Sequence, residues 1–210
     1  MRQGADHVTK RRLDYQLIES LIPPGSRVLD LGCGDGQLLK ELAEHKGCWV
    51  RGIEINDQAV SECLRRGMPV YHGDMLEGMT FFRDSYFDVV ILSQTLQQTA
   101  NPPQVIHEML RVGRSAIISF PNFGYWLTRL QLLFTGKMPR HSLLPYPWYS
   151  TPNVHLCTVT DFRELCAQEG LERGEEIFLS PPDRRISGFL ANWRAGLAIF
   201  QVRRIEGPHG

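Results

Sequence analysis

The sequence predicts a doubly wound α/β protein with a mostly parallel sheet of seven strands. Short apolar runs alternate with segments of helical periodicity over residues 27–120, as expected of repeated βα units. A glycine-rich turn at residues 32–36 follows the first apolar run. The 210 residues are 42% hydrophobic and 22% charged, which is typical of one globular domain that can bury a sizeable core.

The first half of the chain contains the predicted parallel strands and their crossover helices. Apolar residues at 13, 17, 18 and 21 have helical spacing, and the following prolines and glycine end that helix. Pro102 can open a later helix, because the first turn of a helix loses nothing from a missing N–H. We expect strands at 27–31, 49–55, 69–72, 87–93 and 115–120, and helices at 13–21, 37–45, 57–66 and 102–112.

The chain past residue 121 differs in composition. A helix with apolar spacing is expected at 124–134, and residues 139–152 then hold four prolines among aromatic residues, which indicates an ordered loop. A helix at 161–169 and strands at 175–180 and 196–203 complete the seven strands. We therefore expect a single domain at 13–205 with an aromatic and proline-rich cap at about 122–157, a flexible tail at 1–12, and disorder at 206–210.

Composition argues against several classes of function. The 23 Lys+Arg balance the 23 Asp+Glu, whereas a dedicated nucleic-acid binder normally shows a basic excess. No apolar run approaches the roughly 20 residues of a membrane helix, and the N-terminal residues do not resemble a signal peptide. The five cysteines are scattered and form no C-x-x-C pair. We therefore expect a cytoplasmic protein with reduced thiols, no metal site, and neither nucleic acid nor membrane as partner.

The glycine turn is the most informative segment. It reads D-x-G-x-G-x-G from Asp30 to Gly36, and Gln37 stands where a dinucleotide fingerprint needs its third glycine. Alternate glycines let a ligand approach the backbone, and a carboxylate at the strand end repels a pyrophosphate. The same carboxylate suits a ligand that carries an ammonium and a sulfonium group. The turn therefore favours S-adenosylmethionine (SAM) over NAD.

Two later carboxylates support the same ligand. Glu54 ends the second strand, where an acid can bind the ribose hydroxyls. Asp74 follows the third strand and is placed to bind an adenine amino group, with Met75 against the ring. We assign to the cofactor site Asp30, Gly32, Cys33, Gly34, Glu54, Ile55, Asp74, Met75 and Ser93.

The chain resembles the class I SAM-dependent methyltransferases in these motifs. A narrower resemblance, to the MetW family of bacterial methionine-biosynthesis proteins, is carried by residues 93–97, 108–113, 119–124 and 151–158 (SQTLQ, EMLRVG, SFPNFG and TPNVHLCT). It implies a Rossmann-like class I methyltransferase fold with SAM or S-adenosylhomocysteine as ligand. It also implies a partner, a homoserine O-acyltransferase that uses an acetyl or succinyl donor, early in methionine synthesis.

Enzymatic activity is left open by the sequence. Methyl transfer needs mainly alignment of the nucleophile, so no universal catalytic residue is expected. The [DNS]-P-P-[YFW] turn of many amino-group methyltransferases is replaced by Ser-Gln-Thr-Leu at 93–96. His155 is a weak candidate for a general base, and its ring could equally bond a loop carbonyl. The protein is therefore either an accessory or regulator of the acyltransferase that senses SAM, or an active methyltransferase on a small-molecule or protein acceptor.

The aromatic segment 120–149 permits two interpretations. It holds eight of the chain's 10 Phe, 4 Trp and 6 Tyr residues, and no acid stands between Glu108 and Asp161. Exposed aromatic residues with arginines are typical of interface hot spots, but the segment could also be a hydrophobic cap over the pocket. The acids concentrate in the other half, since residues 1–105 hold 14 Asp+Glu and 11 Lys+Arg.

Overall fold

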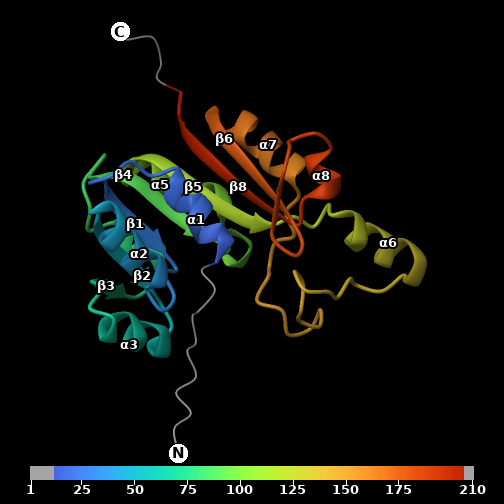
Figure 1. The fold of residues 1–210 in the computed structure, drawn as a ribbon, viewed down its shortest axis with the longest axis horizontal. Helices are drawn as coiled ribbons and strands as arrows, with labels where there is room; N and C mark the ends of the chain where they lie inside the picture. Colours follow the sequence, from blue (N-terminus) through green and yellow to red (C-terminus); the bar gives the residue numbers. More distant parts are fainter. Residues whose placement is uncertain (1–11, 206–210) are drawn as a thin grey trace, which may run out of the picture.

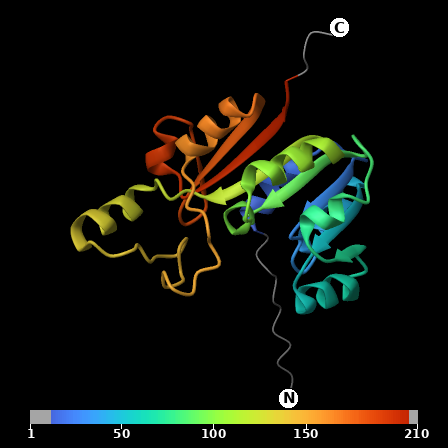
Figure 2. The same cartoon turned by 180° about the vertical axis from the view of Figure 1, so that it is seen from behind.

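The computed structural model describes residues 12–205. The flexible tail predicted at 1–12 lies outside the described residues except for Arg12, and so does the predicted disorder at 206–210. The described chain forms one eight-stranded sheet with helices on both faces (Figures 1 and 2). This confirms the predicted doubly wound α/β fold, although the sheet has eight strands and not seven.

The strand order is β3-β2-β1-β4-β5-β8-β6-β7. The first five strands in this order are parallel, and β8, β6 and β7 pair antiparallel. The chain winds outward in one direction from β1 to β3 and in the other from β4 to β8, so the switch lies between β1 and β4. The strands are β1 (Arg27–Leu31), β2 (Trp49–Glu54), β3 (Val70–His72), β4 (Phe87–Ser93), β5 (Gly113–Pro121), β6 (Leu171–Ser180), β7 (Arg184–Ile186) and β8 (Leu197–Arg204).

The helices connect these strands in the predicted order. Asn56 and Asn101 cap two of them through their side chains, and Thr158 with Asp161 forms a capping box at a third. The helices are α1 (Leu13–Ser20), α2 (Gln37–Lys46), α3 (Asp57–Arg65), α4 (Met75–Met79), the 3-10 turn η1 (Leu96–Gln98), α5 (Pro102–Val112), α6 (Trp126–Thr135), α7 (Val159–Gln168) and α8 (Ala191–Arg194).

The elements that the sequence did not predict are short. Strand β7 has three residues, and α4, η1 and α8 have five, three and four, which is too few to show a period. Strand β6 begins at Leu171, four residues before its predicted start. Its first half carries exposed charged residues that pair with β8 through the backbone.

The core lies on both faces of the sheet. Strand β4 shows the division, because Val89 and Ile91 pack with α1 and α2 while Val90 and Leu92 face α5 and α7. Burial on both faces explains the uninterrupted apolar run of this strand. The α5–α7 side is aromatic: the rings of Phe120, Phe162 and Phe200 lie 4.8–5.8 Å apart.

The switch between β1 and β4 positions the candidate site. In open α/β sheets, ligands bind beyond the carboxyl ends of the strands where the winding reverses. Helix α6 and the loop after it follow the carboxyl end of β5 and project away from the sheet (Figures 1 and 2). Within residues 12–205, no helix is both long and apolar enough to cross a membrane.

Candidate functional site

The glycine turn leaves β1 in a backbone conformation that favours glycine. Gly34 and Gly36 have φ of 55° and 73°, in the left-handed region that costs other residues strain. A Cβ on Gly36 would lie 2.6 Å from Cys63 Sγ on α3, so this glycine also permits close packing. A Cβ on Gly34 would meet nothing within 4 Å. Gly34 therefore lies at an open surface that a ligand can approach.

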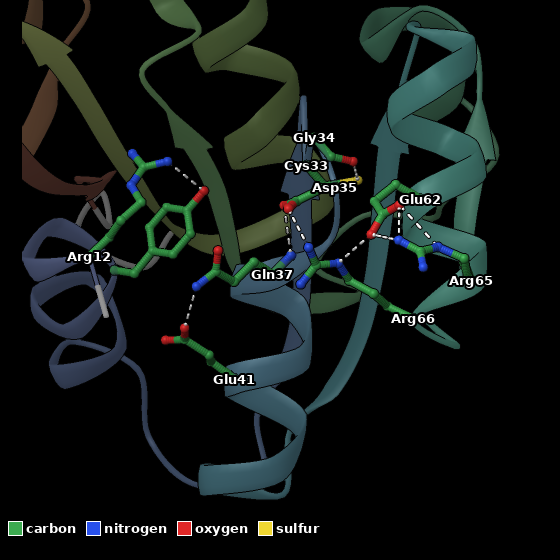
Figure 3. A network of polar contacts seen from close by, with 10 residues as sticks. Arg12, Cys33, Gly34, Asp35, Gln37, Glu41, Glu62, Arg65 and Arg66 are labelled. Atoms are coloured by element: carbon green, nitrogen blue, oxygen red, sulfur yellow. Dashed lines mark hydrogen bonds and ion pairs between the residues drawn. The ribbon is translucent and has the colours of Figure 1, made fainter. Parts of the chain in front are cut away.

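Asp35 ties the glycine turn to the helices around it. Its Oδ2 accepts a hydrogen bond of 2.6 Å from Arg66 Nη2 at the end of α3, and its Oδ1 accepts one of 3.2 Å from Gln37 N (Figure 3). Gln37 in turn donates to Glu41 one turn further along α2. The turn is therefore held from both sides, which fixes the position of its backbone.

Glu54 joins the end of β2 to the glycine turn. Its Oε1 accepts from Ile55 N at 2.9 Å and from Asn56 N at 2.8 Å, and its Oε2 accepts from Gly34 N at 2.9 Å. Hydrogen bonds to a carboxylate are stronger than those between neutral groups. The buried carboxylate of Glu54 is thus oriented by three backbone N–H groups.

Asp30 is a buried carboxyl near the turn, and one of its oxygens lacks a hydrogen-bond partner among the described residues. Its side chain is 3% exposed, and its Oδ1 has no hydrogen-bond partner among the described residues. Burial, and secondarily the charge of Glu54, raise the pKa of Asp30 to about 8. A buried carboxyl without a partner has a high free energy when ionised, and a cationic ligand would relieve that cost. The residues present therefore fit a ligand of the SAM type.

A cavity of about 290 Å³ lies at this edge of the sheet. Five of the predicted cofactor residues line it: Gly32, Glu54, Ile55, Asp74 and Met75. The remaining lining residues are Ile53, Gly73, Thr95 and Gln98. Thr95 and Gln98 come from the segment after β4. Sequence reasoning did not assign them, although the 93–97 motif indicated that this segment was distinctive.

The other four predicted residues lie outside the lining of this cavity. Gly34 borders it through its hydrogen bond to Glu54, and Asp30 lies in β1, two residues before Gly32, where the charge of Glu54 acts on it. Cys33 is buried, and its Sγ occupies the space beside Gly52, where a Cβ would lie 2.4 Å away. Burial raises the pKa of this thiol. Ser93 Oγ lies 3.2 Å from Ser119 Oγ, within the sheet. Their assignment to the cofactor stays a prediction.

A larger cavity of about 660 Å³ lies on the other side of the Gln94–Thr95 peptide. Arg12, Asp14 and Gln94 form its polar wall, and Leu143 and Leu197 contribute apolar surface. Gln94 has a φ of 52°, which is strained for a residue other than glycine, and its Nε2 donates to Asp14 Oδ2 at 2.8 Å. The segment after β4 thus contributes Gln94 to this cavity and Thr95 and Gln98 to the cofactor cavity, so a ligand in one cavity would lie close to the other.

His155 lies away from the cofactor cavity. It is exposed, its Nε2 is 3.4 Å from Ala100 O, and it lines a separate cavity of about 370 Å³ with Leu96 and Cys157. Sequence analysis left open two roles for His155, a general base or a ring that bonds a loop carbonyl, and the contact with Ala100 O corresponds to the second. The general-base role of His155 stays a prediction.

One group of side chains in the described part has metal-ligand character. Oxygen and nitrogen atoms of Glu19, Glu41 and His45 lie within 4.8 Å of one another on α1 and α2. The group lines none of the cavities described above. It therefore contributes no ligand to the candidate cofactor site.

Comparisons with known proteins place this geometry in a family. Residues 12–202 match the family described as methionine biosynthesis protein MetW. The bifunctional methionine biosynthesis protein MetXA/MetW of Rhodopirellula baltica is 38% identical over 178 residues, which cover 79% of this chain and 28% of that protein. The chain thus spans less than a third of that relative. A ubiquinone biosynthesis O-methyltransferase of Hahella chejuensis is 33% identical over 49% of this chain and 44% of its own.

Solved structures share the fold at low sequence identity. A SAM-dependent methyltransferase from Mesorhizobium loti superposes with a TM-score of 0.66 and 16% identity, covering 92% of this chain and 99% of that one. The [4+2]-cyclase SpnF gives 0.64 and 20%, with coverage of 92% and 81%. These similarities confirm the predicted class I methyltransferase fold and leave the reaction open.

Proposed function

The chain belongs to the MetW family of methionine biosynthesis proteins, and from this we propose that it binds SAM or S-adenosylhomocysteine and acts with, or regulates, a homoserine O-acyltransferase. The observation that carries the proposal is the bifunctional relative, in which a MetW part and a MetXA part share one polypeptide. Parts that are fused in one organism often act on each other as separate chains in another. The acyltransferase, with an acetyl or a succinyl donor, is therefore the partner proposed for this chain.

The cofactor would be held by residues of the 290 Å³ cavity and its border. We assign the ribose hydroxyls to Glu54, the adenine amino group to Asp74, the adenine ring to Met75, and the cationic end to Asp30. Gly32, Cys33, Gly34, Ile55 and Ser93 complete the proposed contacts. When bound, SAM supplies an electrophilic methyl group on a sulfonium.

We favour a regulatory role because the cofactor cavity offers no free general acid or base. Glu54 and Asp74 are the only titratable side chains among its described lining residues. Glu54 is committed to three backbone N–H groups, and Asp74 caps α4 through its Oδ1. A SAM sensor needs no such pair. It needs only that SAM binds the free protein and the complex with different affinity, which by linkage changes partner binding by the same factor.

An active methyltransferase is the second candidate, and the 660 Å³ cavity favours it. This cavity adjoins the cofactor cavity across the turn after β4 and contains charged, hydroxyl and apolar groups. A small-molecule acceptor, or a side chain of a protein acceptor, could enter there. Alignment of that acceptor with the sulfonium would then supply much of the rate.

We also propose that residues 13–205 act as one SAM-binding domain in the cytoplasm. All five cysteines are free thiols, as is usual in a reducing compartment.

The test is to assay the acyltransferase of the same organism with and without this chain. Transfer to homoserine is measured from acetyl-CoA and from succinyl-CoA, with SAM or S-adenosylhomocysteine added. We expect the chain to change the acyl-transfer rate and SAM to modulate that change. Glu54→Gln should abolish the SAM effect, while Glu44→Gln, on the exposed face of α2, should retain it.

Two results would contradict the regulatory proposal. One is an acyltransferase that neither binds the chain nor changes its rate in its presence. The other is transfer of labelled methyl from SAM to homoserine or to another intermediate of the pathway without any effect on acylation, which would establish the methyltransferase instead.

A further inference from the structure

Helix α6 and the loop that follows it, residues 126–157, form a projection that we call the arm (Figures 1 and 2). Six of the ten residues of α6 are large and apolar, yet only Thr128 is buried. Leu133 and Phe134 are 74% and 78% exposed. A helix of this composition normally buries an apolar stripe against a core. The arm therefore presents an apolar helix without a covering layer in the described structure.

The loop of the arm adds aromatic residues to this surface. Trp148 and Tyr149 are 73% and 74% exposed, and their rings meet edge to face at 5.7 Å. Trp148 and Tyr146 also line a hollow of about 460 Å³ together with Met138. Aromatic residues and Met are enriched in the buried centre of protein interfaces, and a hollow beside exposed rings can take a side chain of a partner.

Hydrogen bonds within the arm and at its base support this surface. Thr128 Oγ1 lies 2.9 Å from His141 Nε2, and Gln131 Oε1 accepts from Arg140 N at 3.2 Å, which ties the loop to α6. At the base, Arg129 Nε donates to Gly124 O at 2.6 Å while its guanidinium lies 5.4 Å from the centre of the Trp193 ring. Binding through a preorganised surface loses little conformational entropy.

Charge indicates what kind of surface the arm fits. Its charged residues are Arg129, Lys137 and Arg140, and it contains no Asp or Glu. None of the three cations forms an ion pair with a carboxylate of residues 12–205. Lys137 and Arg140 stand at the rim of the hollow that Trp148 lines. A complementary partner has an apolar patch surrounded by carboxylates.

The arm is also hydrogen-bonded to the segment that lines the cofactor cavity. Val154 N and His155 N both donate to Gln97 O, at 2.8 and 3.0 Å, and the next residue, Gln98, lines that cavity. Among the described residues, no side chain of the arm lines the cavity itself. The arm can therefore contact a partner while the cofactor site stays open.

We propose that the arm is the surface through which this chain docks on the acyltransferase, onto an apolar patch of that enzyme rimmed by carboxylates. The inference rests on the proposed function, because the partner is the one named there. The bifunctional relative supports this occupant, since a MetXA part and a MetW part share one polypeptide there. A second copy of this chain is the competing occupant, and the experiment below separates the two.

The experiment measures the affinity of the purified acyltransferase for the full chain and for two independent arm variants. One variant removes apolar contacts (Phe134→Ala with Trp148→Ala), and the other reverses charge (Lys137→Glu with Arg140→Glu). We expect each to weaken binding at least tenfold, and the wild-type affinity to fall as salt increases. The matched control is Leu64→Ala with Arg65→Glu on α3, which removes an exposed leucine and reverses an exposed cation at another site. It should bind as the wild type does.

Thermal unfolding and SAM binding of each variant are measured in parallel, and both should match the wild type because all four substituted side chains are exposed. If the wild type binds the acyltransferase and both arm variants bind equally well, the docking surface is elsewhere and the inference is wrong, while the proposed function stands. If the wild type does not bind, the proposed function itself fails. If the arm variants instead convert a dimer of this chain to monomers without loss of acyltransferase affinity, the arm is a self-association surface and the inference is again wrong.

Discussion

Affinity for SAM should increase as the pH rises from 6 to 9, because Asp30 must lose its proton before it can stabilise a cation. The side chain is buried, its Oδ1 has no partner in the described structure, and its pKa is raised to about 8 by burial and by Glu54. At neutral pH most molecules therefore carry a neutral Asp30. A cationic ligand lowers this pKa again, so binding and proton release are linked.

The size of the effect follows from the ionised fraction. With a pKa of about 8, Asp30 is about 1% ionised at pH 6 and about 90% ionised at pH 9. If only the ionised form binds SAM tightly, the apparent affinity scales with this fraction and changes about 90-fold, or about 2.7 kcal/mol. The ammonium of SAM itself loses a proton near pH 8, so the affinity of wild type must be compared with that of Asp30→Asn at each pH. The ratio of the two affinities isolates the carboxyl.

The assay is titration calorimetry of SAM into both proteins from pH 6 to 9, in buffers with different heats of ionisation. At pH 6.5, wild type should release close to one proton more per SAM bound than Asp30→Asn, because the amide cannot ionise. The affinity ratio of wild type to variant should rise with pH and level off above about pH 8. A ratio that does not change with pH, or equal proton release by both proteins, would refute the assignment of Asp30 to the cationic end of the ligand.

The same carboxyl should affect stability without ligand, and the sign follows from its pKa in the two states. The unfolded pKa is near 3.9 and the folded pKa is higher, so between about pH 4 and pH 8 the folded state holds a proton that the unfolded state has lost. The free energy of unfolding of the wild type therefore falls as pH rises through this window, and the contribution of Asp30 to it no longer changes above about pH 8. Asp30→Asn should match wild type near pH 4 and exceed it at pH 9 by up to about 5 kcal/mol in urea unfolding.

Three further predictions concern the site. Glu54→Gln places an amide donor against backbone N–H donors, so it should lower the free energy of unfolding by about 1–3 kcal/mol, as measured by urea unfolding. It should also weaken SAM binding at least tenfold, as measured by calorimetry. Gly36→Ala should destabilise by roughly 1–3 kcal/mol more than Gly34→Ala, since only the former places a Cβ against Cys63; equal melting temperatures would contradict this. His155→Ala should leave SAM affinity within roughly twofold, because His155 lines a separate cavity; a larger loss of SAM affinity would contradict this.

The fold was predictable because its central strands are buried on both faces. A run such as residues 89–92, apolar at every position, is characteristic of a central parallel strand, and glycine and proline mark the ends of the elements. The short elements were not predictable, because three to five residues carry no period. Strand β7 pairs with β6 as a hairpin through a turn at residues 181–183, and its three residues are too few to reveal a strand by alternation.

The site was predictable where the chain itself determines the geometry. The carboxyl ends of parallel neighbours meet at one edge of a sheet, so Gly32, Glu54 and Asp74 had to converge once the strands were assigned. Strand β4 ends at the same edge, but the irregular segment after it has no period, so the sequence does not indicate that Thr95 and Gln98 are its residues that reach the cavity. The unpaired state of Asp30 also escaped the sequence, because a missing hydrogen-bond partner is a property of the packed surroundings.

The arm marks the limit of reasoning from pattern. Apolar residues at helical spacing predict that a helix buries one face, and residues 126–135 have that spacing. The pattern does not specify whether the covering surface comes from the same chain or from another. Here the described chain leaves Leu133 and Phe134 exposed, while Thr128, a polar residue, is the buried one. The proposed docking of the arm on the acyltransferase would account for the exposed apolar face of α6, and a rim of carboxylates on that enzyme would complement Lys137 and Arg140.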